Sequence, residues 1–211
     1  MVLLVEGVFV IAIFVLCQKK EGKIRQASSV DDIVRHKKVK FLDNNFLALP
    51  NHKNILTELI NKNIKCQFNQ GLDIRLIDPE NSELLSRLNY LGEYIFAFDD
   101  YLYLKIIEKK IDLMRWRKPF NFKFFVYCHP DMELSNICKR IEWLKHKKIL
   151  PYVMRNIVCW DSALNEFYID LAAYSNQPNV FKKMSFIEFL KKRHTNNDRI
   201  SSSENLYYEN I

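Results

Sequence analysis

Short apolar runs alternate with amphipathic segments along most of this chain. The apolar runs are rich in β-branched and aromatic residues, which is typical of strands. The segments between them place apolar residues at spacings of three and four, which is typical of helices packed on one side. The pattern predicts strands at 7–17, 39–43, 65–69, 93–98, 122–127 and 151–155, and helices at 30–36, 54–63, 79–88, 103–116 and 134–146.

This alternation predicts six βα units whose parallel strands are joined by right-handed crossovers, which is an α/β fold. We expect 1–178 to form the core, with Asp78 and Pro79 opening one of its helices as N-cap and first-turn proline. A basic amphipathic helix at 179–194 is expected to dock on the core, with membrane or partner contact as the alternative. The polar segment 195–211 is expected to be a flexible tail.

The apolar run 7–17 is shorter than the about 20 residues that a membrane span needs. Its Lys pair follows the apolar core and no small-residue cleavage site appears, so a secretory signal is not expected either. A strand buried in a parallel sheet is the favoured interpretation. A membrane anchor formed by residues 2–17 is the alternative.

Composition adds limits to this picture. The 211 residues are 48% hydrophobic and 27% charged, as in a globular domain, and carry a net charge of +7. The lysines are scattered over expected helix faces, with no Arg-rich stripe between aromatic residues, so we do not expect nucleic-acid binding. Five cysteines without a CxxC pair indicate buried thiols in a reducing compartment, and a cytoplasmic location is expected.

Polar residues gather where the expected strands end. The carboxyl ends of parallel strands share one edge in α/β sheets and barrels, and ligands bind there. Within NQGLDIRL, a bulge or turn near Gly71 must re-aim the chain. The candidate binding residues at this edge are Asp43, Asn44, Asn45, Asn69, Gln70, Asp73, Arg75, Asp99, Asp100 and Arg155.

Local roles compete with ligand binding at these positions, because Asn and Asp also favour turns and helix caps. Asp73 and Arg75 can pair with each other or contact a ligand. One of Asp99 and Asp100 can face the edge while the other caps the next helix. His129 has no second metal-binding side chain suitably placed, so a structural role is favoured over a metal site.

Five segments together resemble radical S-adenosylmethionine proteins of the bacterial and phage Fe-S oxidoreductase type: KKEGKIR, FLDNNFLALPNHKNILTELI, CQFNQGLDIRL, FAFDD and PYVMRN. They occur in that family's order and cover about residues 18–177. The resemblance implies a partial (β/α)6 TIM-like barrel with parallel strands. It also implies a [4Fe-4S] cluster held by three cysteines spaced C-x3-C-x2-C, and reductive cleavage of S-adenosylmethionine to a 5'-deoxyadenosyl radical. The candidate residues above stand where relatives bind the cofactor or substrate.

The chain departs from the family where the cluster should be. The three ligand positions fall at Val8, Ala12 and Val15, and Cys17 is the only thiol nearby. The strand exit at 127–135 also lacks the glycine that lets the backbone approach adenine. A single thiolate does not hold a cluster, so we expect no metal site and no radical chemistry in this chain. The sequence assigns no catalytic residue.

Two hypotheses follow. The first is a radical S-adenosylmethionine family protein, truncated or inactive because its cluster loop is altered; a shifted reading frame or altered start would explain why KKEGKIR is intact directly after it. The second is a non-enzymatic barrel that binds a partner, a nucleic acid or a membrane. Neither names a substrate, because relatives modify very different molecules.

Overall fold

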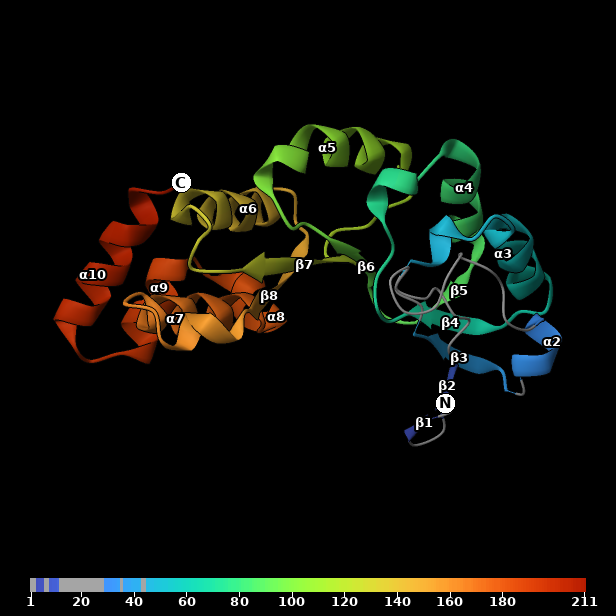
Figure 1. The fold of residues 1–211 in the computed structure, drawn as a ribbon, viewed down its shortest axis with the longest axis horizontal. Helices are drawn as coiled ribbons and strands as arrows, with labels where there is room; N and C mark the ends of the chain where they lie inside the picture. Colours follow the sequence, from blue (N-terminus) through green and yellow to red (C-terminus); the bar gives the residue numbers. More distant parts are fainter. Residues whose placement is uncertain (1–2, 6–7, 12–28, 35, 43–44) are drawn as a thin grey trace. The chain divides into compact units, whose positions relative to one another are not determined.

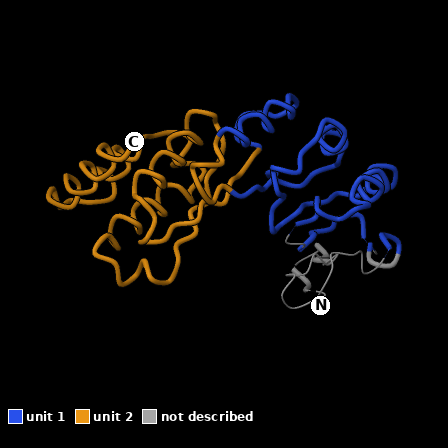
Figure 2. The backbone as a smooth tube through the Cα atoms, turned by 45° about the horizontal axis from the view of Figure 1, so that its top comes forward, with its two compact units in different colours: residues 1–97, 105–121 blue, residues 98–104, 122–211 orange. Residues whose placement is uncertain are grey.

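A computed structural model describes residues 3–5, 8–11, 29–34, 36–42 and 45–211 of the chain. Two compact units divide it (Figure 2): 1–97 with 105–121, and 98–104 with 122–211. Both units contain parallel strands and helices, so the chain is a mixed α/β protein, as the sequence predicts. In the described part of the chain, no helix has the length and hydrophobicity needed to cross a membrane.

Unit 1 contains a five-stranded sheet in the order β1-β2-β3-β4-β5 (Figure 1). Only β1 runs antiparallel to its neighbour; the other pairs are parallel. The parallel strand expected within 7–17 is therefore confirmed at β2, while residues 12–17 lie outside the described part. The strands are β1 (Leu3–Val5), β2 (Val8–Ile11), β3 (Lys38–Phe41), β4 (Lys65–Phe68) and β5 (Asn89–Tyr90).

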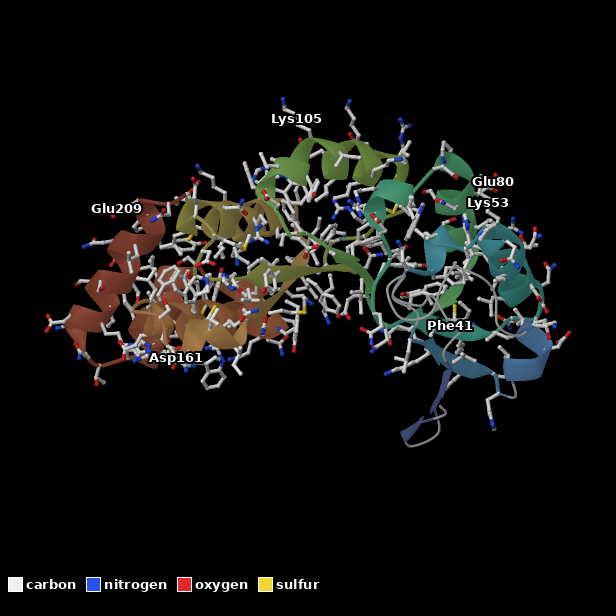
Figure 3. The ribbon with its side chains drawn as sticks, viewed as in Figure 1. Phe41, Lys53, Glu80, Lys105, Asp161 and Glu209 are labelled. Atoms are coloured by element: carbon white, nitrogen blue, oxygen red, sulfur yellow. The ribbon has the colours of Figure 1, made fainter. Side chains whose placement is uncertain are left out.

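The centre of unit 1 is aromatic. Phe41 of β3 stacks on Phe68 of β4, with ring centroids 5.2 Å apart, and Phe46 approaches Phe68 to 4.3 Å. All three rings are buried, and Figure 3 labels Phe41 at the sheet. Because side chains alternate along a strand, Val39 and Cys66 also point into this core.

The helices of unit 1 are α2 (Val30–Ile33), α3 (His52–Asn61), α4 (Pro79–Arg87) and α5 (Leu104–Leu113). Asp78 caps α4 as predicted: its side chain accepts from the Asn81 N–H, and the Asn81 side chain accepts from the Asp78 N–H. Lys53 of α3 reaches Asp78 at 3.0 Å and Glu80 at 2.5 Å. Figure 3 labels Lys53 and Glu80, and such an exposed ion pair adds little stability.

Gly71 redirects the chain after β4, which confirms the turn expected there. Its φ of +93° is a conformation that side chains with a Cβ rarely adopt. Leu72 then forms a parallel bridge with Phe96 of β6 (Tyr94–Ala97). The chain therefore runs from β5 to β6 along one side of β4 and of the residues that follow β4. Strand β5 pairs with β4, and β6 pairs with Leu72.

Unit 2 is built on two long parallel strands, β7 (Phe122–Cys128) and β8 (Leu150–Arg155), paired from Lys123–Leu150 to Cys128–Arg155. Phe98, the residue after β6, donates its backbone N–H to the Phe125 carbonyl at 2.8 Å, so the chain leaving β6 lies beside β7. Helix α6 (Leu134–His146) has the predicted bounds.

Asn176 occupies the side of β8 that faces away from β7. Its Oδ1 accepts from the Val153 N–H at 2.6 Å, and its Nδ2 donates to the Val153 carbonyl at 3.0 Å. The side-chain amide thus makes the two hydrogen bonds that a further strand would make. Because unpaired strand edges can template aggregation, this contact also protects β8.

The C-terminal part differs from the expectation in three ways. An additional helix, α7 (Asn165–Ser175), precedes the expected basic helix. The basic segment forms two helices, α8 (Pro178–Lys183) and α9 (Phe186–Arg193), because Ser185 and Glu188 make a capping box that starts a new helix. Where a flexible tail was expected, α10 (Asn197–Tyr208) buries Tyr207, whose hydroxyl donates to Glu142.

Candidate ligand site at the strand ends

The polar residues after β3 and β4 lie at neighbouring strand ends in unit 1. Phe41 and Phe68, the last residues of these strands, are register partners, and the Asn69 N–H donates to the Phe41 carbonyl at 2.8 Å. Gln70 is exposed beside Asn69. The candidates Asp43 and Asn44, the expected cluster-ligand positions Ala12 and Val15, and the nearby thiol of Cys17 lie outside the described residues. Val8 is the first residue of β2.

Asn45 is a candidate with an unsatisfied side-chain atom. It precedes the 3-10 helix Phe46–Ala48, but its side chain makes no capping hydrogen bond. Its Oδ1 is buried and has no hydrogen-bond partner within the described part of the chain. A buried acceptor without a donor costs about 1–3 kcal/mol, so a ligand that donates a hydrogen bond here would recover that free energy.

His52, which the sequence analysis did not single out, has a similar unsatisfied atom in the same segment. Its Nδ1 lies 2.7 Å from the Leu49 carbonyl, while its buried Nε2 has no hydrogen-bond partner among the residues that the structure describes. If Nδ1 carries the proton, Nε2 is an acceptor, like Asn45 Oδ1. The resemblance segment DNNFLALPNH contains both residues, but nothing in the sequence shows that these atoms are left unpaired.

Asp73 and Arg75 are paired with each other, which is one of the two roles that the sequence left open for them. Arg75 Nε and Nη2 donate to the two carboxylate oxygens of Asp73 at 2.8 and 2.7 Å. Burial acts to raise the pKa of Asp73, but the hydrogen bonds from Arg75 outweigh burial, and the pKa is lowered from its ordinary value. Asp73 also accepts from the Arg75 backbone N–H, so the pair stabilises its own turn.

In unit 2, Asp100 has the capping role and Asp99 is exposed. Asp100 accepts from the Leu102 N–H and from Asn136 Nδ2, both at 2.9 Å, and these hydrogen bonds lower its pKa. Asp99 is therefore the carboxylate of this pair that is available to solvent or a ligand.

Arg140 of α6 donates hydrogen bonds to backbone carbonyls near the ends of β6 and β7. Its side chain is fully buried, and it donates to the Phe98 carbonyl at 2.5 Å and the Tyr127 carbonyl at 2.9 Å. Burial lowers the pKa of this guanidinium, whose ordinary value is high enough that it stays charged. The sequence signal was present: Arg140 falls on the apolar face of α6 with Ile137, Ile141 and Leu144, which are also buried.

Arg155 ends β8 and stacks over Trp160, with its Cζ 5.0 Å from the ring centroid. Its Nη1 is buried, and no described residue forms a hydrogen bond with it. A guanidinium with a spare donor suits a carboxylate or phosphate, and the exposed Trp160 ring beside it offers a flat apolar surface.

The described thiols are poor metal ligands as they stand. Burial raises the pKa of Cys66, Cys128 and Cys138 to about 12 each, whereas metals bind the thiolate. His129 contacts Asp131, whose backbone N–H donates to its Nδ1 at 3.1 Å. Among the described residues, no group of three or more His, Cys, Asp and Glu side chains is arranged to hold a metal ion.

Comparisons of the chain with protein-family models, with curated proteins and with solved structures find no match.

Proposed function

We propose that this chain is a radical S-adenosylmethionine family protein that keeps a partial (β/α)6 barrel and a cofactor pocket but carries out no radical chemistry. It would bind S-adenosylmethionine, or a closely related nucleoside, without cleaving it. Binding would take place at the carboxyl ends of the strands.

The order of the strands is the observation that carries this proposal. Within each unit, segments that follow one another along the chain lie side by side: β2 beside β3, β3 beside β4, β4 beside β5, and β7 beside β8. Two residues outside the strands add to this series, because Leu72 bridges to β6 and Phe98 bonds to β7. The strand pairs β2–β3, β3–β4 and β7–β8 are all parallel. A doubly wound sheet reverses its strand order at a switch point, whereas the strands of a barrel continue in one direction, and the order within each unit supports the proposal because it contains no reversal.

The residues present do not fit a [4Fe-4S] cluster. The three positions that the resemblance assigns to ligands carry valine, alanine and valine, which offer no donor atom. The described cysteines stand on β4, β7, α6 and the segment Ile157–Trp160, and their thiols are buried. Anaerobic reconstitution should therefore leave iron and acid-labile sulfide near zero per chain, and about four of each would contradict the loss of the cluster.

Asn45, which follows β3, fits part of S-adenosylmethionine. The amino group of its methionyl portion is a cation with several N–H donors, and the buried Oδ1 of Asn45 is an acceptor without a partner. Hydrogen bonds to a charged donor are the stronger kind, worth about 1.5–3 kcal/mol. Asn45 would therefore hold the amino group and fix the orientation of the ligand.

Thermal unfolding of three proteins tests this assignment. S-adenosylmethionine should raise the Tm of the unaltered chain and of Asn54→Ala, an exposed position on α3, by the same amount, because a ligand that binds only the folded state stabilises it. Asn45→Ala should lose most of that increase. Without ligand, Asn45→Ala should be no less stable than the unaltered chain, because an unsatisfied buried acceptor is removed. An equal increase in Asn45→Ala and Asn54→Ala would overturn the role of Asn45.

A further inference from the structure

A small cleft lies in unit 2 between the start of α7 and one side of α10. Its volume is about 190 Å³, below the about 300–1,000 Å³ of sites for drug-sized ligands, so a ligand in it must be small. Arg199 of α10 holds the two helices together, because its guanidinium contacts Asp170 at 3.1 Å and Glu166 at 3.0 Å. The residues that line the cleft include Leu164, Glu166, Phe167, Arg199, Ser203 and Leu206.

The first turn of α7 supplies backbone donors to this cleft. Leu164 is the N-cap, and its apolar side chain offers no acceptor to the N–H groups that follow. Within the described part of the chain, the N–H groups of Glu166 and Phe167 donate no hydrogen bond. A helix N-terminus also carries about half a positive elementary charge. The start of α7 is therefore suited to a ligand with a carboxylate.

A buried hydroxyl lines the same cleft from α10. Ser203 is only 4% exposed and lies on the buried side of α10 with Ile200 and Tyr207. No residue that the structure describes forms a hydrogen bond with its Oγ. Water satisfies the first N–H groups of many helices, but a hydroxyl buried in a protein normally has a partner. The hydroxyl and the helix start together point to a ligand.

The carboxylates beside the cleft limit which ligand fits. Arg193 and Arg199 both contact the buried carboxylate of Asp170, which is therefore compensated. His194 Nε2 also lies 2.9 Å from Asp170. Glu166 differs, because its side chain is 68% exposed and Arg199 contacts only one of its two oxygens. Glu166 would repel a doubly charged anion such as phosphate, whereas a ligand with an ammonium group can bind its second oxygen.

We propose that this cleft binds a free α-amino acid with a small apolar side chain. The ligand carboxylate accepts from the N–H groups of Glu166 and Phe167 and from the Ser203 hydroxyl, which are charge-assisted hydrogen bonds. The ammonium group binds the Glu166 carboxylate, and the side chain packs on the two leucines that line the cleft. The cleft belongs to unit 2 and the proposed cofactor contact of Asn45 to unit 1, so either proposal can fail alone.

An NMR titration of the ¹⁵N-labelled chain with L-valine, and with L-alanine as a second probe, tests the proposal and locates the site. The amide resonances of Glu166 and Phe167 should shift with a saturable dependence on the amino-acid concentration. Isobutylamine, which is valine without its carboxylate, should bind at least about tenfold more weakly, because the hydrogen bonds to a charged group are lost. Isovalerate, which is valine without its ammonium group, should bind about two- to fivefold more weakly.

Two variants with matched controls test the residues. Ser203→Ala should weaken valine binding at least about tenfold, whereas Ser201→Ala, at an exposed position of the same helix, should leave it unchanged. Glu166→Gln should weaken binding about two- to fivefold, as is usual for an exposed ion pair. Its control is Glu209→Gln at the C-cap of α10, and Figure 3 labels Glu209.

Three results would overturn the proposal. The first is the absence of a saturable shift at the amides of Glu166 and Phe167 with either amino acid up to about 10 mM, where a Kd of about 1 mM would be detected. The second is equal binding of valine, isobutylamine and isovalerate. The third is equal affinity of Ser203→Ala and Ser201→Ala for valine. Alanine favours a helix, so both serine variants should stay folded, and their NMR spectra check this.

Discussion

Asn176 offers the sharpest test of the packing in unit 2, because one side chain satisfies both backbone groups of one strand residue. In Asn176→Ala, the N–H and carbonyl of Val153 lose their partners, and Val153 is only 4% exposed. Each unsatisfied buried group costs about 1–3 kcal/mol, so we expect a loss of about 2–6 kcal/mol in the free energy of unfolding. For a chain of this size that corresponds to a fall in Tm of about 4–24 °C.

Urea and thermal unfolding of Asn176→Ala measure this loss, with Asn179→Ala as the control. Asn179 lies three residues along the chain, at the start of α8, and is exposed. Its replacement should change stability by less than about 0.5 kcal/mol, as is usual for surface positions. Equal stability of the two variants would refute the reasoning, because it would show that the amide contributes nothing to the edge of β8.

Asn176→Asp separates the donor from the acceptor. The introduced carboxylate can still accept from the Val153 N–H, but a second oxygen replaces the donor to the Val153 carbonyl. Protonation restores a donor, so the folded state raises the pKa of the introduced carboxyl above its unfolded value. The destabilisation relative to the unaltered chain should therefore be full at neutral pH and should diminish as pH falls toward the unfolded pKa. A pH-independent difference would argue against the proposed geometry.

Three further predictions concern single side chains. Arg75→Ala should raise the pKa of Asp73 toward its ordinary value, which a carboxyl-carbon NMR titration measures. In the unaltered chain the folded state lowers this pKa, so the stability that Asp73 contributes is present above its unfolded pKa. That stability is lost as pH falls through the folded pKa. The Cys128 thiol, whose pKa burial raises to about 12, should react with a thiol reagent at neutral pH only as fast as the protein opens, and rapid reaction in the folded state would contradict its burial. Arg140→Met should lower the free energy of unfolding by about 2–4 kcal/mol in urea titrations, because two strand-end carbonyls lose their donor; an unchanged midpoint would show that these hydrogen bonds add no stability.

Much of the strand and helix pattern could be predicted from the sequence because its signals are local. The three-and-four spacing in α6 sets both of its bounds, and the Asp78–Pro79 pair starts α4 where predicted. Helix α7 was missed because it is buried on several sides, so its apolar residues do not repeat on one face. The C-terminal helix α10 was missed because its sequence is polar and serine-rich, and its position depends on the burial of Tyr207.

The candidate site was predictable only as a set of strand-end residues. Sequence spacing cannot decide whether Asp73 binds Arg75 or a ligand, because that depends on the rotation of the chain after Gly71. It also cannot show that Asn45 Oδ1 is buried without a hydrogen-bond partner among the described residues.

Calorimetric titration of the chain, purified without iron, with S-adenosylmethionine tests the central proposal most directly. The account predicts saturable binding of one ligand per chain, with a Kd in the micromolar range or about −8 kcal/mol, and marked weakening in Asn45→Ala. No saturable heat up to millimolar ligand would contradict a retained cofactor pocket, and the parallel α/β fold would then have to serve another ligand.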